Sequence, residues 1–273
     1  MPRSPWHRLA SEPQRGPEPS QVRARLRSTE QGVSVRAVIV GSSSVTAQRI
    51  TQALVADGAR VVGINPTDFE HPALAANVVA DMSEPPRAEL AMAAALDLLG
   101  GIDVLITAAA KQLGGRLHET TAQTWRAVLA GTLDTTFNAM HAAVPHLGPG
   151  SAIVALTSVN AYLAHPGNSA YATAKGAVHA LITQASLEYA PRGIRVNAVA
   201  PALIDGHAMP DGAAGYPMGR TPTSEEVAQA VAFLASPRAS GISGVILPVD
   251  AGLSVASPVA FMRPAMAQRW QTP

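Results

Sequence analysis

Short apolar runs alternate along this chain with longer segments in which apolar residues recur every three or four positions. The runs are rich in β-branched residues, as buried strands are. The longer segments have the spacing of helices that bury one face. This alternation predicts strands at 35–40, 60–65, 77–81, 102–107, 151–156, 195–199 and 244–249, and helices at 47–55, 84–99, 120–146, around Tyr171 and at 224–234.

Continuous apolar strands separated by helices imply a parallel sheet that is covered on both faces. We therefore expect one α/β domain over residues 34–256, with a doubly wound parallel sheet. Such sheets bind ligands beyond the carboxyl ends of their strands, where the direction of winding reverses. Gly41, Thr107, Ser158 and Pro201 each stand at or just past the carboxyl end of a predicted strand. The pattern thus brings candidate site residues to one edge of the sheet.

The two ends of the chain differ from this central part. Residues 1–33 contain five prolines and many charged side chains, which leaves too little apolar surface to offset the entropy of ordering. We expect a disordered N-terminal extension there. Residues 257–273 are expected to form a C-terminal tail.

Composition narrows the class of protein. With 47% hydrophobic and 14% charged residues, the chain can build one large core, and its net charge of +1 comes from scattered arginines, so we expect no nucleic acid partner. The absence of cysteine excludes disulfides and thiol nucleophiles, and the scattered histidines predict no metal site. Since no apolar run could span a bilayer, we expect no membrane partner and a cytoplasmic protein.

One cluster of residue types suggests proton transfer. Tyr171 and Lys175 are four residues apart, so a helix would place the phenol and the ammonium on one face. A nearby cation favours the phenolate and would lower the pKa of Tyr171 towards the range of efficient acid/base chemistry. Ser158 could hold a substrate oxygen beside them.

These residues belong to a longer set of matching motifs. The chain resembles the short-chain dehydrogenase/reductase family over about residues 35–255, with a Rossmann-like fold implied. The resemblance rests on Gly41, Ser158, Tyr171, Lys175, the run Arg195-Val-Asn-Ala-Val-Ala-Pro201 and the closing Val249-Asp250-Ala251-Gly252.

The resemblance implies roles for the matching residues. Tyr171 would exchange a proton with a small carbonyl or alcohol substrate, Lys175 would lower the Tyr171 pKa and bind the nicotinamide ribose, and Ser158 would orient the substrate oxygen. The cofactor would be NAD or NADP, and the protein a homodimer or homotetramer. By position, the residues that would contact the cofactor are Gly41, Ser43, Ser44, Val45, Thr46, Asn65, Asp81, Met82, Ala108, Ala109, Tyr171, Lys175, Pro201 and Ile204.

The expected cofactor cradle departs from the family pattern. Val45 and Ala47 stand where the family has glycines, and a valine adds bulk where backbone approaches a pyrophosphate. The segment 107–110 replaces the usual Asn-Asn-Ala-Gly turn, and Gly206 replaces a threonine that commonly contacts phosphate. Asn65 stands where an aspartate or arginine would distinguish NAD from NADP.

Three functions therefore stay open at the level of sequence. The intact Ser158, Tyr171 and Lys175 set favours a nicotinamide-dependent oxidoreductase. The altered turn favours an enzyme that uses the same residues for dehydration, isomerisation or cyclisation without a hydride, and a non-catalytic binding protein is the third. Other expectations concern single residues: a Thr132 hydroxyl bonded within its own helix, a structural Asn197, and Trp125 and Phe137 packed in the core.

Overall fold

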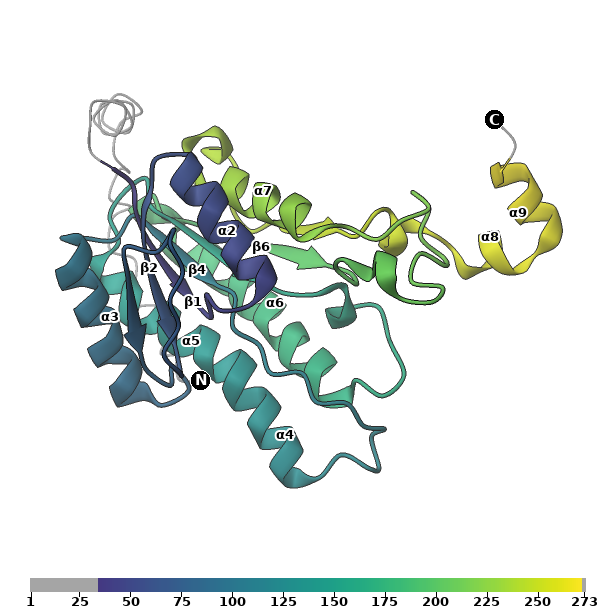
Figure 1. Ribbon diagram of the computed structural model, residues 1–273, viewed down its shortest axis with the longest axis horizontal. Helices are drawn as coiled ribbons and strands as arrows, with labels where there is room; N and C mark the ends of the chain where they lie inside the picture. The colour runs from purple at the N-terminus through teal and green to yellow at the C-terminus, as the bar shows by residue number, and fades with distance from the viewer. Residues whose placement is uncertain (1–33, 272–273) are drawn as a thin grey trace, which may run out of the picture.

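The computed structural model describes residues 34–271, and the predicted N-terminal extension lies outside the described residues. Within this range the chain folds around a seven-stranded sheet in the order β3-β2-β1-β4-β5-β6-β7 (Figure 1). All neighbouring strands are parallel, which confirms the predicted doubly wound α/β fold. The strands are β1 (Arg36–Val40), β2 (Arg60–Asn65), β3 (Ala76–Val79), β4 (Val104–Thr107), β5 (Ala152–Leu156), β6 (Arg195–Pro201) and β7 (Ile246–Val249).

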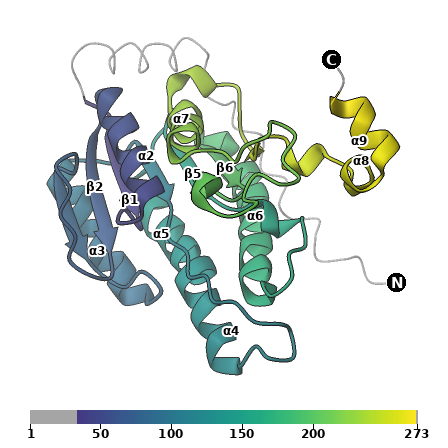
Figure 2. The same ribbon diagram turned by 45° about the vertical axis from the view of Figure 1, so that its right-hand side comes forward.

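Helices cover both faces of the sheet, as Figures 1 and 2 show. On one face α2 (Val45–Ala56) and α7 (Ser224–Ala235) pack against each other. The other face carries α3 (Pro85–Leu99), α4 (Ala122–Leu129), α5 (Thr135–Ala143) and α6 (Ser169–Tyr189).

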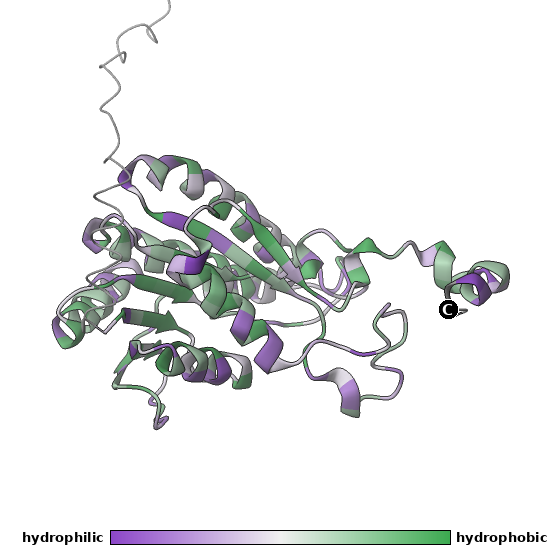
Figure 3. Ribbon diagram, turned by 90° about the horizontal axis from the view of Figure 1, so that it is seen from above, coloured by the Kyte–Doolittle hydropathy of each residue, from purple (hydrophilic) through white to green (hydrophobic). Residues whose placement is uncertain are grey.

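The strands are apolar on both sides because both sides are buried. In β1, Ala37 and Ile39 pack in the cluster beneath α2 and α7, while Val38 and Val40 pack in the cluster beneath α3, α5 and α6. Successive side chains of a strand point to opposite faces, so one strand supplies both cores. Figure 3 shows these central strands in the colours of apolar residues, with polar residues along the outer helices.

The winding reverses between β1 and β4, which are neighbours in the sheet although β2 and β3 come between them in sequence. The amide of Gly41 donates to the carbonyl of Ile64 (2.8 Å), and that of Ala108 donates to the carbonyl of Val40 (2.8 Å). The turns after β1 and β4 therefore lie side by side at the edge where ligands bind in such sheets.

The predicted helix at 120–146 is helical but not one regular α-helix. A π-helical turn, Ala130–Asp134, separates α4 from α5, and a 3₁₀ turn, Val144–His146, follows α5. A π-turn adds one residue to the helix and is frequent at functional sites. Here it faces the edge of the sheet that holds the candidate site, which the apolar spacing alone did not reveal.

Of the two aromatic residues expected in the core, Phe137 is not there. Its side chain on α5 is 50% exposed and stacks on His141 one turn later, with ring centroids 5.7 Å apart. The inward face of α5 is occupied by Ala139 and Met140. Trp125 on α4 is partly buried against a small apolar cluster.

Two buried polar residues of β6 join distant parts of the chain. Asn197 donates from Nδ2 to the carbonyl of Ile242 (2.9 Å) and accepts from the amide of Val245 (3.1 Å), which confirms its structural role. The Arg195 guanidinium donates to the carbonyl of Leu234 (2.6 Å) and to the carbonyls of the two residues that follow it. Arg195 thereby satisfies the last turn of α7, whose carbonyls lack partners within the helix.

Replacing Arg195 with methionine is expected to lower the free energy of unfolding by about 2 kcal/mol, because it leaves three carbonyls at the end of α7 without their donor. Urea unfolding measures this. Arg238→Met removes a guanidinium that is mostly exposed and is expected to change the free energy by less than about 0.5 kcal/mol. Equal losses in the two variants would contradict the role given to Arg195.

The chain beyond the sheet ends in two short helices, α8 (Pro258–Met262) and α9 (Pro264–Gln271), which project away from the body in Figures 1 and 2. Among residues 34–271 no helix combines the length and apolarity needed to cross a bilayer.

Candidate active site

The candidate catalytic residues come from two elements at the carboxyl edge of the sheet. Ser158 follows β5, and Tyr171 and Lys175 lie one turn apart on α6. The Lys175 ammonium is 5.7 Å from the centre of the Tyr171 ring, and a hydrogen bond joins the Tyr171 phenol to the Ser158 hydroxyl. The three side chains predicted from sequence are therefore brought together.

The end of β6 completes this cluster. The Ser158 hydroxyl accepts from the amide of Asn160 (3.2 Å) and lies 3.4 Å from the carbonyl oxygen of Pro201. These contacts fix the position of the Ser158 hydroxyl beside the phenol. Pro201 thus lies beside the catalytic cluster.

The pKa of Tyr171 differs in direction from the sequence prediction. Burial raises the Tyr171 pKa above its ordinary value, and the hydrogen bond from Ser158 lowers it only in part. Lys175 was expected to lower this pKa, but burial lowers the pKa of Lys175 itself to about 7. A lysine that is partly neutral near pH 7 stabilises a phenolate weakly, so burial is the main influence on the Tyr171 pKa.

Lys175 reaches inward from α6. Its Nζ donates to the carbonyl of Leu156 at the end of β5 (2.6 Å). One turn later on α6, the His179 ring nitrogen Nε2 lies 2.9 Å from the Thr157 hydroxyl, and burial lowers the pKa of His179. Both side chains tie α6 to the strand end that carries Ser158.

Replacing Lys175 with methionine is expected to make stability less dependent on pH. Lys175 has a pKa of about 7 in the folded chain against 10.5 ordinarily, so between these values the unfolded chain binds more protons and the free energy of unfolding rises with pH. Below this window the cost of burying the ammonium is present in full, and above it the cost is absent.

The gain in stability from Lys175→Met is therefore expected to be larger at about pH 6.5 than at about pH 9.5, with a difference of about 3 kcal/mol. Urea unfolding at both pH values measures it. The other lysine of the chain, Lys111, is exposed, and Lys111→Met is the matched control. A gain that is the same at both pH values would show that Lys175 is charged throughout.

The turn after β1 depends on a glycine. Gly41 has a φ of +83°, and a Cβ at this position would lie 2.5 Å from the backbone nitrogen of Ala109. The two adjacent turns can approach this closely only because Gly41 has no side chain. Ala109 has no positive φ, so an alanine is accommodated on the other side of this contact.

The residues that replace the family's other glycines in this turn are accommodated. Val45 is the first residue of α2, and its side chain is 64% exposed. Ala47 is fully buried where α2 meets the sheet. The Ser44 hydroxyl caps the helix by accepting from the Ala47 amide (3.2 Å).

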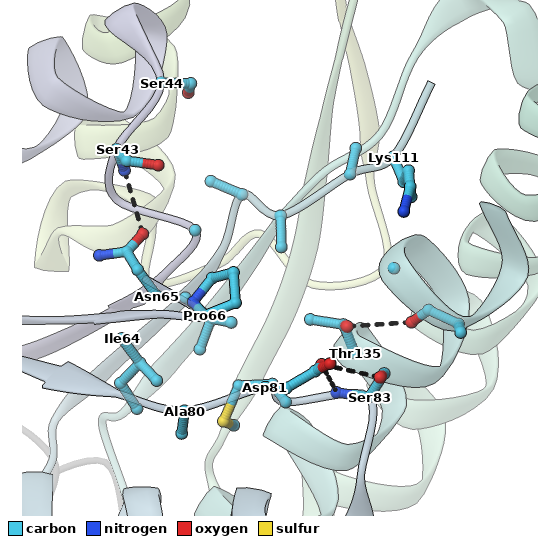
Figure 4. Close-up of a pocket in the computed structure, with 18 of the residues that line it drawn as sticks. Ser43, Ser44, Ile64, Asn65, Pro66, Ala80, Asp81, Ser83, Lys111 and Thr135 are labelled. Atoms are coloured by element: carbon cyan, nitrogen blue, oxygen red, sulfur yellow. Dashed lines mark hydrogen bonds between the residues drawn. The ribbon is translucent and has the colours of Figure 1, made fainter. Parts of the chain in front are cut away.

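Asn65 at the end of β2 holds the turn in place. Its Nδ2 donates to the Ser42 hydroxyl (2.6 Å) and to Oδ1 of Asn77 (2.7 Å). Its Oδ1 accepts from the Ser43 amide (3.2 Å) (Figure 4). The Asn65 amide is 1% exposed, so its hydrogen-bonding groups serve the protein rather than a solvent-facing ligand.

A cavity of about 620 Å³ opens beside this turn (Figure 4). Of the predicted cofactor residues, it brings together Gly41, Ser43, Ser44, Asn65, Asp81, Met82, Ala108 and Ala109. Val45, Thr46 and Ile204 are not in its lining, and neither are Tyr171 and Lys175 of the candidate catalytic cluster and Pro201 beside it.

Asp81 is an acidic residue in the lining of the cavity. Its Oδ1 accepts from the hydroxyl (2.7 Å) and the amide (3.0 Å) of Ser83, and the hydroxyl bond is the main reason that the Asp81 pKa lies below its ordinary value. The carboxylate is thus ionised and held in place in the lining of the cavity.

Thr46 is linked to α7 instead of facing the cavity. Its hydroxyl lies 3.1 Å from that of Ser224, and the Ser224 hydroxyl donates to the carboxylate of Asp205. Since the Ser224 proton is used by Asp205, the Thr46 proton is directed to Ser224. The Thr46 side chain is therefore not a free donor for a phosphate.

Thr132 was expected to bond within its own helix, and that expectation is wrong. Its hydroxyl accepts from the Lys111 amide (3.0 Å) and so joins the π-turn to the loop after β4.

Three residues that were not predicted from sequence also line the cavity, namely Lys111, Gly131 and Thr135. The available signal was the position of Lys111, directly after the Thr107-Ala-Ala-Ala110 turn.

Comparisons with known proteins agree with this geometry. Residues 41–254 match the family described as enoyl-(acyl carrier protein) reductase. Galactitol 2-dehydrogenase (L-tagatose-forming) of Cereibacter sphaeroides is 35% identical over 248 residues, which cover 80% of this chain and 94% of that protein. For 3beta-hydroxysteroid dehydrogenase 1 of Eggerthella lenta the identity is 30% over 243 residues, covering 80% and 93%.

A solved structure is similar throughout the same region. Ligand-free aldohexose dehydrogenase of Thermoplasma acidophilum superposes with a TM-score of 0.76 and is 30% identical, over 83% of this chain and 96% of that one.

Proposed function

Because the chain belongs to the short-chain dehydrogenase/reductase family and is an oxidoreductase, we propose that it transfers a hydride between NAD(P)(H) and a carbonyl or alcohol substrate. The observation that carries this proposal is the Ser158, Tyr171 and Lys175 cluster, which lies at the same edge of the sheet as the cavity.

The residues around the cavity fit an adenine dinucleotide. Gly41 lets two turns approach closely. The amides of Val45 and Thr46 at the start of α2 make no hydrogen bond within the described part of the chain, so they are free to bind a phosphate. Asp81 and Ser83 offer polar groups to a base or ribose. When bound, the cofactor supplies or accepts the hydride.

Tyr171 supplies the proton. Its raised pKa keeps the phenol protonated near neutral pH, so the phenol can donate to a substrate carbonyl oxygen as that oxygen becomes negative. The Ser158 hydroxyl, which is bonded to the phenol, orients the same oxygen. Lys175, with a pKa of about 7, is able to exchange protons with its surroundings in the same pH range.

A secondary alcohol, or the ketone made from it, is the proposed substrate class. Galactitol 2-dehydrogenase and 3beta-hydroxysteroid dehydrogenase are named for substrates of this kind. Absorbance at about 340 nm, where the reduced nicotinamide absorbs, follows the oxidation of polyols, cyclic alcohols and sterols with each cofactor. Turnover of at least one class supports the proposal, and binding of the cofactor without turnover of any class would contradict it.

We also propose a homodimer or homotetramer that uses the outer faces of α5 and α6. Phe137 on α5 is 50% exposed and Leu187 on α6 is 73% exposed, and apolar side chains of this size are more stable when covered. Light scattering after size exclusion measures the mass, and a monomer at micromolar concentration would contradict this assembly.

A further inference from the structure

The cavity beside the turn after β1 has very few charges in its lining. Apart from Asp81 and Lys111, all its lining residues are apolar or uncharged. An adenine dinucleotide carries at least two negative charges on its pyrophosphate, so a pocket that binds it gains from a cation. Within this lining Lys111 is the cation.

Lys111 is held in position by its backbone. Its amide donates to the Thr132 hydroxyl (3.0 Å), and the facing residue of the π-turn is Gly131. A Cβ on Gly131 would lie 2.8 Å from the Cβ of Lys111, so the glycine allows the loop to lie against the helix. The π-turn therefore places Lys111 on the wall of the cavity.

The ammonium of Lys111 has no hydrogen-bonding partner within the described part of the chain. It makes no hydrogen bond and no ion pair with any residue among 34–271. Asp81, the lining residue of opposite charge, accepts hydrogen bonds from Ser83 and interacts with Lys111 only as a weaker coulombic contribution to its lowered pKa. Figure 4 shows the Lys111 side chain on one side of the cavity, across from Ser43, Ser44 and Asn65.

The opposite wall offers few donors to a phosphate. The Thr46 hydroxyl is directed to Ser224, and the Ser43 amide is bound by Asn65. What remains near the start of α2 are two backbone amides and the hydroxyls of Ser43 and Ser44, all uncharged. The turn thus lacks a cation of its own.

We propose that Lys111 binds a phosphate group of the dinucleotide and supplies the positive charge that the turn after β1 lacks. This inference rests on the proposed function, because it assigns a residue to the same cofactor site. The phosphate is either in the pyrophosphate, which NAD and NADP share, or at the 2′ position of the adenosine ribose, which NADP alone carries. The neutral Asn65 does not repel a phosphate at that second position.

Calorimetric titration with nucleotide fragments tests the assignment. Adenosine, ADP and 2′,5′-ADP are titrated into the parent chain, Lys111→Met and Lys111→Arg. Lys111→Met is expected to weaken the binding of at least one of the two phosphorylated fragments roughly fivefold to tenfold and to leave adenosine binding unchanged. Lys111→Arg keeps the positive charge, and its affinity for each fragment is expected to stay within about twofold of that of the parent.

The two phosphorylated fragments distinguish the two positions. An equal loss for ADP and 2′,5′-ADP assigns Lys111 to the pyrophosphate side, and a larger loss for 2′,5′-ADP assigns it to the 2′-phosphate. The loss is expected to shrink at high salt, because ions screen an exposed charge. Arg60→Met, at the opposite edge of the sheet where β2 begins, is the matched control for the loss of one surface charge.

Two results would overturn the proposal, and they differ in what else they contradict. If the parent binds ADP and 2′,5′-ADP and Lys111→Met binds them equally well, the role of Lys111 is wrong while the proposed function stands. If the folded parent binds neither fragment, the cofactor site itself is wrong and the proposed function fails with it.

Discussion

Tyr171→Phe is expected to lower the turnover number at least about 100-fold and to leave the binding of the reduced cofactor unchanged. The substitution removes the phenolic hydroxyl and keeps the ring, which is the part of Tyr171 that packs against Val128, Ala170 and Ala174. Its effect therefore reports on the proton and not on packing. Steady-state turnover of the alcohol or ketone found in the substrate screen measures the loss.

Tyr189→Phe is the matched control for this loss. Tyr189 is the last residue of α6, far along the helix from the catalytic cluster, and its ring packs on Arg192. Its turnover is expected to equal that of the parent. If Tyr171→Phe also kept most of its turnover, another group would be the proton donor and the role given to Tyr171 would be wrong.

Gly41→Ala is expected to lower the free energy of unfolding by about 3 kcal/mol and to weaken cofactor binding. The φ of +83° at Gly41 costs an alanine about 1 kcal/mol. The new Cβ would also lie 2.5 Å from the Ala109 nitrogen and 2.9 Å from the Ala109 Cβ, so the two turns must separate. Urea unfolding measures the change in stability.

Gly58→Ala separates the cost of backbone strain from the cost of the contact between a Cβ at position 41 and Ala109. Gly58 has nearly the same φ, +87°, but a Cβ there would meet no atom within 4 Å. It is therefore expected to cost only the backbone strain, about 1 kcal/mol. A loss at Gly41 no larger than that at Gly58 would mean that the two turns are not held close together.

The fold could be predicted because the sheet is buried on both faces. Each strand is then a continuous apolar run, and in the segments between the strands apolar residues recur at helical intervals. The same reasoning missed the π-turn at Ala130–Asp134 and the exposure of Phe137. A π-turn adds one residue without changing which residues are apolar, so the pattern does not show it. Phe137 is exposed because Ala139 and Met140 already fill the inner face of α5.

The proximity of Tyr171 and Lys175 in the candidate site could be predicted because helical spacing fixes how they face each other. The direction in which the Tyr171 pKa is shifted could not be predicted. This direction depends on how deeply the phenol and the ammonium are buried. Burial disfavours the charged form of Lys175 as well as the phenolate form of Tyr171.

The altered cofactor turn was the hardest part to interpret from sequence. A valine in place of a glycine suggested added bulk against the pyrophosphate, but the Val45 side chain points to solvent and is not in the lining of the cavity. That placement shows that the Val45 side chain does not fill the cavity, which counts against the steric argument for an enzyme without redox chemistry. Lys111 could not be predicted as a site residue, because its proposed role depends on the π-turn. That turn brings Gly131 and Thr132 against Lys111.

A fluorescence titration decides whether this chain binds a nicotinamide dinucleotide, as the proposed function requires. NADH and NADPH are titrated separately into the purified chain, and unfolding is monitored in parallel to show that the protein is folded. The proposed function predicts saturable binding of at least one of them at micromolar concentration. A folded protein that binds neither at millimolar concentration would contradict it and would leave Ser158, Tyr171 and Lys175 to proton transfer without a hydride.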